Sequence, residues 1–195
     1  MENKPQFIVV HHTATDRRKT TFAAVNEYHR KKWNFKSKLG FYIGYHYFID
    51  GNGVITHGRD NLEAGAHTSQ GGMNYKSIGV CLAGNFDIES PSTEQTVQLA
   101  ELMYQVSKAY GIPAANVHPH RKYAPKSCYG RNLPDLWAQN LLVERLQRDE
   151  LQGQVLVEKA RDIVDILGYD RGITAAQKAE VVDLLTRALD KAKSL

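Results

Sequence analysis

Two short runs of consecutive apolar residues constrain the fold more than any other feature of this sequence. Phe7-Ile8-Val9-Val10 and Ser77-Ile78-Gly79-Val80-Cys81-Leu82-Ala83 have the composition of buried strands rather than of amphipathic helices. Stretches with helical spacing of apolar residues follow each of them. The order of strand, helix, hairpin, strand and helix predicts an α/β fold, with a central mixed β-sheet flanked by helices.

Turn and cap residues mark the other elements of this part of the chain. A helix is expected over 20–33, and the turn Asp50-Gly51-Asn52-Gly53 predicts a hairpin between strands 45–49 and 54–57. Ser92 followed by Gln95 has the pattern of a capping box, which opens a helix that Gly111 and Pro113 close. The segment 116–132, rich in His, Pro, Lys and Cys, is expected to be irregular, before a further helix from 134 to about 148.

The last part of the chain differs in composition. After Gln152-Gly153 aromatic residues almost vanish, and two helical stretches remain, one ending at Leu167 and one starting at Thr174 with Gln177 placed for a capping box. We therefore predict a main domain over 1–150 and a helical C-terminal extension over 151–195. A helical hairpin of about 45 residues is only marginally stable on its own, so we expect it to serve packing, targeting or interaction with a protein partner.

Composition excludes several classes of protein. No apolar run approaches the roughly 20 residues that span a bilayer, and the first residues lack the apolar core of a secretory signal. Two cysteines cannot form a disulfide scaffold. The formal net charge is +4, with nine basic and ten acidic residues after residue 140, so the positive surplus lies in the first 140 residues. That surplus suits a polyanionic partner, either nucleic acid or an anionic wall polymer.

A histidine and a cysteine in one loop carry the first chemical signal. His120 and Cys128 are separated by seven residues, enough for a chain reversal that brings both side chains to one point. Imidazole and thiolate are zinc ligands, and a catalytic zinc site uses three protein ligands with one position open. His11, at the end of a buried strand, is well placed to be the third ligand. The alternative is an ordinary loop histidine beside an inert cysteine.

Several motifs in order resemble those of a known family. The first is Val10-His11-His12-Thr13-Ala14-Thr15, followed by the segment 44–60 with Gly44-Tyr45-His46 and Gly58-Arg59-Asp60. Gly65-Ala66-His67 with Asn74–Val80 and Ala124-Pro125-Lys126-Ser127-Cys128 complete the pattern. The chain is thereby similar, over about residues 7–140, to the zinc-dependent N-acetylmuramoyl-L-alanine amidases. That superfamily includes phage lysozyme-type endolysins and peptidoglycan recognition proteins.

The resemblance implies one Zn²⁺ ion held by His11, His120 and Cys128. His118-Pro119-His120 offers two histidines where one ligand is expected, and the eight-residue offset from His120 to Cys128 fits the phage pattern. His118 stays open as the alternative ligand.

The same resemblance implies that Tyr45 and Lys126 are catalytic. Lys126 would place a positive charge where the tetrahedral oxyanion develops, and Tyr45 would hydrogen-bond the water or the intermediate and move a proton. His67, in a Gly-rich loop, is expected to bind substrate or steady the oxyanion. Strand alternation turns His12 and His46 away from the site, whereas His29 and His57 look like surface or packing residues and Cys81 like a core residue.

The expected function is zinc-dependent hydrolysis of the amide bond between N-acetylmuramic acid and L-alanine in peptidoglycan, by a phage or prophage endolysin. We expect it in the host cytoplasm until its release to the cell wall, with peptidoglycan as partner and nucleic acid unfavoured. Two alternatives stay open: a non-catalytic peptidoglycan-binding module, and a cytosolic amidase that recycles muropeptides.

Overall fold

The computed structural model describes residues 2–171 and 174–193 of the chain. Its strands are β1 (Phe7–His12), β2 (Tyr47–Ile49), β3 (Ile55–His57), β4 (Ser77–Leu82) and β5 (Val117–Pro119). Its α-helices are α1 (Phe22–Trp33), α2 (Thr93–Tyr110), α3 (Trp137–Arg171) and α4 (Ala175–Lys193). Three short 3-10 helices are η1 (Gln70–Tyr75), η2 (Ala114–Asn116) and η3 (His120–Lys122).

The strands form one mixed sheet in the order β3-β2-β4-β1-β5. β1 is parallel to both of its neighbours, β4 and β5, and β2 is parallel to β4, whereas β3 is antiparallel to β2. The predicted α/β fold with a central mixed sheet is confirmed. Because the carboxyl ends of β1 and β4 meet at one edge, side chains at that edge are positioned for a site.

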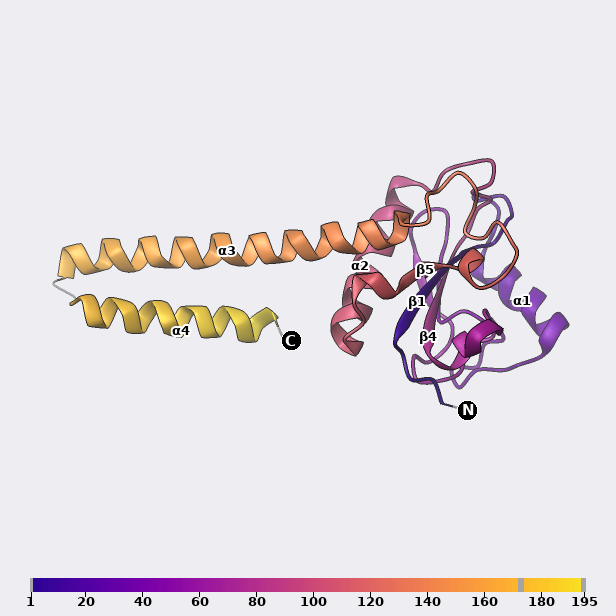
Figure 1. Ribbon diagram of the computed structural model, residues 1–195, viewed down its shortest axis with the longest axis horizontal. Coiled ribbons are helices and arrows are strands. Elements are labelled where there is room, and N and C mark those ends of the chain that lie inside the picture. Colours follow the sequence, from indigo (N-terminus) through magenta and orange to yellow (C-terminus); the bar gives the residue numbers. More distant parts are fainter. Residues whose placement is uncertain (1, 172–173, 194–195) are drawn as a thin grey trace. The chain divides into compact units, whose positions relative to one another are not determined.

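Helices cover both faces of the sheet, and Figure 1 shows the strands β1, β4 and β5 between α2 and α1. Phe22 and Val25 of α1 pack on a buried cluster that includes Phe48 and Cys81. In the register of the parallel strands, Cys81 lies opposite both His11 and Phe48, so all three share the face that α1 covers. Cys81 is fully buried there, as expected of a core residue.

Helix caps follow the local sequence. Ser92 and Gln95 form the predicted capping box at the start of α2, with each side chain bonded to the backbone of the other residue. Gly111 ends α2 in the left-handed conformation at φ +64°. Thr21 caps α1. The predicted turn of the hairpin is present, since the Asp50 carboxylate accepts hydrogen bonds from the backbone N–H groups of Asn52 and Val54.

Some boundaries differ from those expected. β2 begins at Tyr47, so Tyr45 precedes the strand rather than lying on it. β5 lies within the segment expected to be irregular, where Val117-His118-Pro119 pairs with Ile8, Val9 and Val10 of β1. A three-residue edge strand containing a proline carries almost no local signal, because its pairing depends on β1, which is more than 100 residues away in sequence.

The helix end expected near Arg148 is wrong, because α3 runs without a break from Trp137 to Arg171, past Gln152-Gly153. A single glycine costs a helix only about 1 kcal/mol, and the flanking leucines, glutamates and glutamines are good helix formers. The helix also passes Leu167 and Gly168, the expected end of that stretch. The second predicted capping box is present at the start of α4, where Thr174 and Gln177 bond each other.

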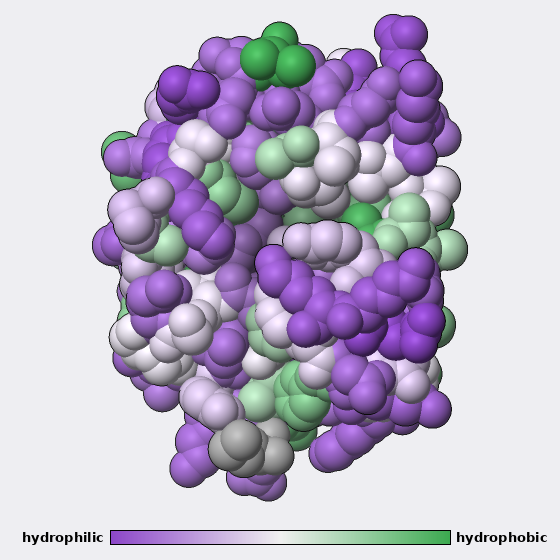
Figure 2. Space-filling model, turned by 90° about the vertical axis from the view of Figure 1, so that its right-hand side faces the viewer, coloured by the Kyte–Doolittle hydropathy of each residue, from purple (hydrophilic) through white to green (hydrophobic). Residues whose placement is uncertain are grey.

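The chain divides into two compact units, residues 1–145 and residues 146–195. In the first unit, Ala138 and Leu142 of α3 are buried and Arg145 forms an ion pair with Glu101 of α2. The face shown in Figure 2 is mostly hydrophilic, with hydrophobic side chains in small separate groups. Among the described residues, no helix is both long and apolar enough to cross a membrane.

Candidate metal centre

Two side chains from one loop meet a third, more than 100 residues before them in sequence, at the carboxyl end of β1. His11 comes from β1, His120 begins η3, and Cys128 lies in the loop that follows. Their ligand atoms all lie within 4.8 Å of one another, and the three residues are buried. Cys128 Sγ is 3.8 Å from His11 Nδ1, and the centroids of the His11 and His120 rings are 4.4 Å apart. This cluster has the donors and spacing to hold a metal ion.

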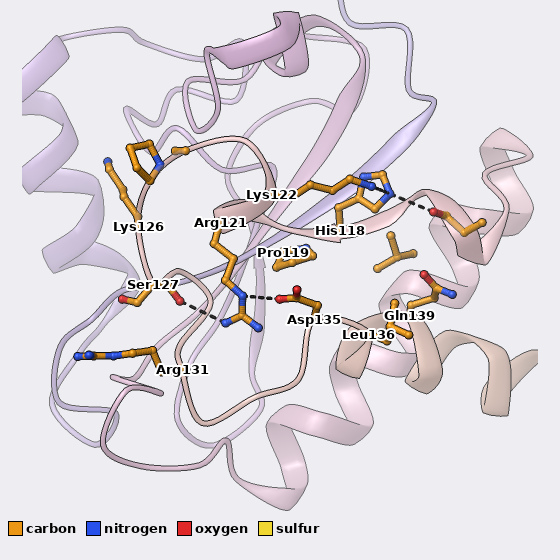
Figure 3. A pocket seen from close by; sticks show the side chains of 14 residues that line it. His118, Pro119, Arg121, Lys122, Lys126, Ser127, Arg131, Asp135, Leu136 and Gln139 are labelled. Carbon is orange, nitrogen blue, oxygen red and sulfur yellow. Dashed lines mark hydrogen bonds and ion pairs between the residues drawn. The ribbon is translucent and has the colours of Figure 1, made fainter.

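One arginine makes several of the bonds that hold the loop carrying two of these residues. The Arg121 guanidinium donates to the carbonyl oxygens of Gly130 and Leu133, each at 2.6 Å, and pairs with the Asp135 carboxylate at 2.5 Å. The Arg121 backbone N–H also donates to the Cys128 carbonyl oxygen. Figure 3 shows Arg121 turned toward Asp135 and the loop backbone. Arg121 therefore fixes the segment in which His120 and Cys128 face each other.

The sulfur of Cys128 sits in a buried environment. The pKa of the Cys128 thiol is raised to about 12, chiefly by burial. The backbone N–H of His12, 3.4 Å from Sγ, acts in the opposite direction and lowers this pKa. A thiol of this kind becomes a thiolate when a cation replaces its proton. The chemistry of the pocket thus favours either a protonated cysteine or a metal-bound thiolate, and disfavours a bare anion.

Both histidines of the cluster are neutral at pH 7. Burial, and then the neighbouring His67 and His120, hold the pKa of His11 well below its usual value. Burial, and then Lys126, lower the pKa of His120 to about 4. A neutral imidazole has a lone pair to give to a metal, so the two rings are in the form that ligation requires.

Tyr45 lies beside His11, with ring centroids 5.0 Å apart. Chiefly because it is buried, its pKa is well above the usual value for a phenol. The hydroxyl therefore keeps its proton at neutral pH, and its hydrogen bond with Cys81 contributes to the raised pKa. Tyr45 also lines a cavity of about 600 Å³ between α1 and the loop 13–20.

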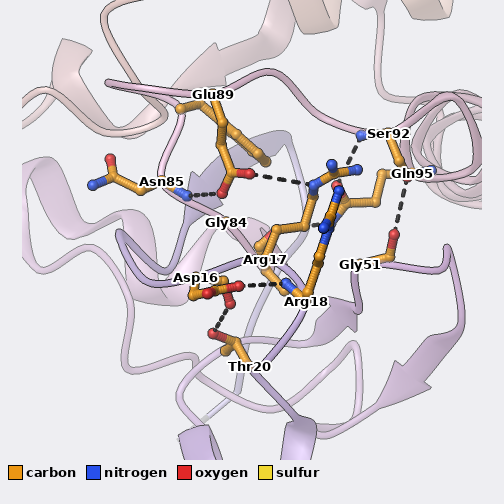
Figure 4. A network of polar contacts seen from close by, with 12 residues as sticks. Asp16, Arg17, Arg18, Thr20, Gly51, Gly84, Asn85, Glu89, Ser92 and Gln95 are labelled. Carbon is orange, nitrogen blue, oxygen red and sulfur yellow. Dashed lines mark hydrogen bonds and ion pairs between the residues drawn. The ribbon is translucent and has the colours of Figure 1, made fainter.

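That cavity has walls of different character. Ala24, Val25 and Tyr28 of α1 line one side, and polar loop residues line the other: Thr13, Thr15, Asp16, Lys19 and Thr20. The loop is anchored in a polar network, shown in Figure 4, in which Arg17 pairs with Glu89, whose carboxylate also accepts from the Asn85 backbone N–H.

Lys126 is exposed and lies two residues before Cys128. Its charge lowers the pKa values of His11 and His120, which places it within electrostatic reach of the cluster. It lines a second cavity, of about 910 Å³, to which none of the three cluster residues contributes and which Figure 3 shows. Tyr45 and Lys126 thus border different cavities.

His118, the alternative ligand, is occupied elsewhere. Its Nδ1 lies 2.5 Å from the Tyr123 hydroxyl, and its Nε2 lies 3.0 Å from the Ala115 carbonyl oxygen and 2.8 Å from Lys122 Nζ, as Figure 3 shows in part. It is not part of the three-residue cluster. The geometry thus brings together the set with His120 rather than the set with His118.

The remaining histidines of the region have structural partners. His12 Nδ1 accepts from the Phe86 backbone N–H, and His46 Nδ1 accepts from that of Gly79. His29, expected at the surface or in packing, is buried and accepts from the Gly44 backbone N–H. His57 is exposed and stacks on Tyr47. His67 lies next to the cluster, with Nδ1 3.0 Å from His11 Nε2.

Two residues that matter for the site had no role assigned from the sequence. One is Arg121, described above. The other is Arg59, whose fully buried guanidinium pairs with Glu63 and donates to the Ile43 and Phe35 carbonyl oxygens, so that it holds the segment before Tyr45. A buried arginine among backbone carbonyls has no characteristic sequence spacing, since its partners are backbone atoms of any residue type.

Comparison with known proteins places the chain in a family. Residues 1–131 match the family model described as N-acetylmuramoyl-L-alanine amidase. The endolysin of Klebsiella phage KP32 is 33% identical over 141 residues, which cover 70% of this chain and 87% of that protein. Peptidoglycan-recognition protein SC2 of Drosophila melanogaster is 27% identical over 135 residues, covering 68% and 72% respectively.

A solved structure gives the same result. The N-acetylmuramoyl-L-alanine amidase LysC from Clostridium intestinale superposes with a TM-score of 0.58 at 28% identity, covering 68% of this chain and 80% of that one. The family match includes all three residues of the cluster. The chain therefore belongs to the N-acetylmuramoyl-L-alanine amidase family and is an enzyme of that family.

Proposed function

We propose that this chain hydrolyses the amide bond between N-acetylmuramic acid and L-alanine in peptidoglycan, using one zinc ion held by His11, His120 and Cys128. The observation that carries the proposal is the buried cluster whose ligand atoms lie within 4.8 Å of one another. Two imidazoles and a thiol are a donor set that suits zinc, and three protein ligands leave the open position typical of catalytic sites. Bound there, zinc would polarise the scissile carbonyl and make water more acidic.

Tyr45 and Lys126 are the proposed catalytic side chains. Tyr45 holds its proton at neutral pH, so its hydroxyl would donate a hydrogen bond to the carbonyl oxygen as negative charge develops there. Lys126 would add a positive charge from the loop of Cys128. Both groups favour the transition state more than the neutral substrate, which is what catalysis of amide hydrolysis requires.

The cavity beside Tyr45 is the proposed entry for substrate. Its wall of loop hydroxyls and its apolar wall from α1 would suit a ligand that combines amide and sugar groups with methyl groups. Neither this cavity nor the larger one beside Lys126 is lined by the three cluster residues. We favour the smaller one because Tyr45, which borders it, has its ring 5.0 Å from that of His11.

The proposed biological role is that of a phage or prophage endolysin, held in the host cytoplasm until its release to the wall. The similarity to the KP32 endolysin supports this role. The similarity to a recognition protein keeps a non-catalytic binding module as the alternative. A complete candidate ligand set with Tyr45 and Lys126 beside it favours the enzyme. Activity on intact sacculi would separate a lytic enzyme from one that recycles soluble muropeptides.

The test is the appearance of new N-terminal alanine in purified peptidoglycan, measured by amine labelling and mass spectrometry. We expect the full chain to produce new N-terminal alanine, a chelator to abolish this activity, and added zinc to restore it. His11→Ala should be inactive, whereas His57→Ala, which alters an exposed histidine outside the cluster, should retain activity. A His11→Ala variant as active as the parent would refute the proposed site.

A further inference from the structure

The ring of His11 has contacts through both of its nitrogens. Nδ1 faces the Cys128 sulfur at 3.8 Å, and Nε2 lies 3.0 Å from Nδ1 of His67. The two rings meet nearly at right angles, at 87°, with centroids 5.0 Å apart. This is the geometry of a hydrogen bond directed from one ring edge to another, not of stacking. The contact joins residues 56 positions apart in the chain.

The ring of His67 is held in place from several sides. A Cβ added to Gly65 would lie 2.4 Å from His67 Cδ2, and one added to Gly79 would lie 2.5 Å from the same atom, so only glycines leave room for the ring. The backbone N–H groups of His67 and Thr68 both donate to the Asn74 side-chain oxygen, at 2.9 and 2.8 Å. The slot and these bonds aim Nδ1 of His67 at His11.

We propose that His67 is a positioning residue that accepts a hydrogen bond from Nε2–H of His11 and so fixes the tautomer of His11 whose Nδ1 lone pair faces the metal position. A neutral imidazole carries one N–H, so a proton held on Nε2 leaves Nδ1 free to ligate. With the opposite polarity, the His11 proton would sit on Nδ1, toward Cys128. The inference rests on the proposed metal function and deepens it.

The same geometry argues against direct contact between His67 and the substrate, the role first expected for it. Nδ1 is engaged by His11 and lies 3.1 Å from the Thr68 hydroxyl. Nε2 is buried and has no hydrogen-bond partner among the described residues. His67 is also absent from the described residues that line the two cavities beside Tyr45 and Lys126. Neither ring nitrogen is therefore presented to a bound ligand.

A pair of variants of nearly equal size tests the hydrogen bond. In His67→Asn the amide oxygen occupies about the place of Nδ1 and still accepts, whereas His67→Leu has no acceptor. Zinc affinity of each full chain is measured by competition with a chromophoric chelator. We expect about 10- to 100-fold weaker zinc binding for His67→Leu, the usual effect of losing a ligand's outer hydrogen bond, and less than about threefold for His67→Asn. His57→Leu is the control and should bind zinc as the parent does.

A second measurement needs no substitution. ¹⁵N NMR of the histidine-labelled full chain reports which nitrogen of His11 carries the proton, and Nε2 is expected. Nδ1 protonation would overturn the proposal, as would unchanged zinc affinity in His67→Leu or equal losses in both variants at equal melting temperature. Lower turnover with unchanged zinc affinity in both variants would assign His67 to the substrate instead. Failure of the parent chain to bind zinc would refute the metal function itself, a distinguishable result.

Discussion

At the scale of single residues, burial sets the protonation of the groups around the cluster. It keeps His11 and His120 neutral and Tyr45 protonated, whereas Lys126 is exposed. The site therefore combines lone pairs for a metal with a hydrogen-bond donor and a cation for developing negative charge. A phenol that keeps its proton is suited to stabilising an oxyanion and poorly suited to removing a proton from water at neutral pH.

Tyr45→Phe tests this role. The change removes one hydroxyl and leaves the ring beside His11, so we expect kcat to fall by about 10²- to 10³-fold, as for loss of one oxyanion donor, with zinc affinity unchanged. The assay is the formation of new N-terminal alanine in peptidoglycan, together with chelator competition for zinc. Tyr47→Phe, on β2, is the matched control and should keep normal kcat. Normal kcat in Tyr45→Phe would exclude the phenol from the reaction.

His46 predicts part of the acid sensitivity of the fold. Burial lowers its pKa from 6.5 to about 4, so the unfolded chain binds a proton that the folded chain does not over this interval. The stability from neutral His46 is fully present above pH 6.5 and is lost as the pH falls toward 4, by about 3 kcal/mol. Between pH 4 and 6.5, the free energy of unfolding in urea should depend less on pH in His46→Gln than in the parent. The difference should correspond to about one proton. Equal slopes would contradict the assignment.

Motifs pointed to the three residues that the structure brings together, and to Tyr45 and Lys126, whose catalytic roles stay predictions. They gave no sign of the contact between His11 and His67. That contact requires the backbone at Gly65 and Gly79 to approach the His67 ring, and an isolated glycine does not reveal what lies beside it. The turn of β2–β3 was predictable for the opposite reason, since Asp50 and its bonding partners are within four residues.

At the scale of elements, the loop after η3 matters most, because it carries Cys128 and depends on Arg121. The Arg121 guanidinium donates hydrogen bonds to two carbonyl oxygens and pairs with a carboxylate. These bonds connect parts of the loop that belong to no helix or strand. A lysine keeps the charge but cannot make the same set of directed bonds.

Arg121→Lys should therefore lower the free energy of unfolding by about 1–3 kcal/mol and weaken zinc binding. Arg131→Lys is the control, because its side chain is 78% exposed and its pairing with Asp87 is at the surface. Denaturant unfolding and chelator competition measure both effects. Equal stability of Arg121→Lys and the parent would show that the loop holds its shape without these bonds.

Elements with strong local signals were predictable, and those decided by tertiary pairing were not. The capping box of α2 was found from Ser92 and Gln95, which contact each other directly. β5 was missed because it is a strand through its pairing with β1, which lies far away in the sequence. The continuity of α3 through Gly153 was also missed, because the cost of one glycine is smaller than the gain from the flanking turns.

At the scale of the whole molecule, the candidate site and its supporting bonds all lie within the unit of residues 1–145. The unit of residues 146–195 has exposed apolar side chains on both helices, among them Leu151, Leu156, Val181 and Leu184. A role for it in packing, targeting or binding a protein partner stays a proposal.

A chain ending at residue 150 tests the independence of the site. Because domains with their own core fold alone, we expect it to bind zinc like the full chain and to cleave soluble muropeptides within about twofold of the full-length rate. If the extension serves targeting, the shortened chain should cleave intact sacculi more slowly than the full chain does. Loss of zinc binding in a folded short chain would show that the extension contributes to the site.

The central claim is that two imidazoles and one thiolate hold one zinc ion. The most direct measurement is the zinc-to-protein ratio of the untagged full chain by elemental analysis, compared with Cys128→Ser and with Cys81→Ser, whose sulfur is buried outside the cluster. We expect a ratio of about one for the parent and for folded Cys81→Ser, and near zero for Cys128→Ser. A parent without zinc, or a Cys128→Ser variant that retains the full ratio, would contradict it.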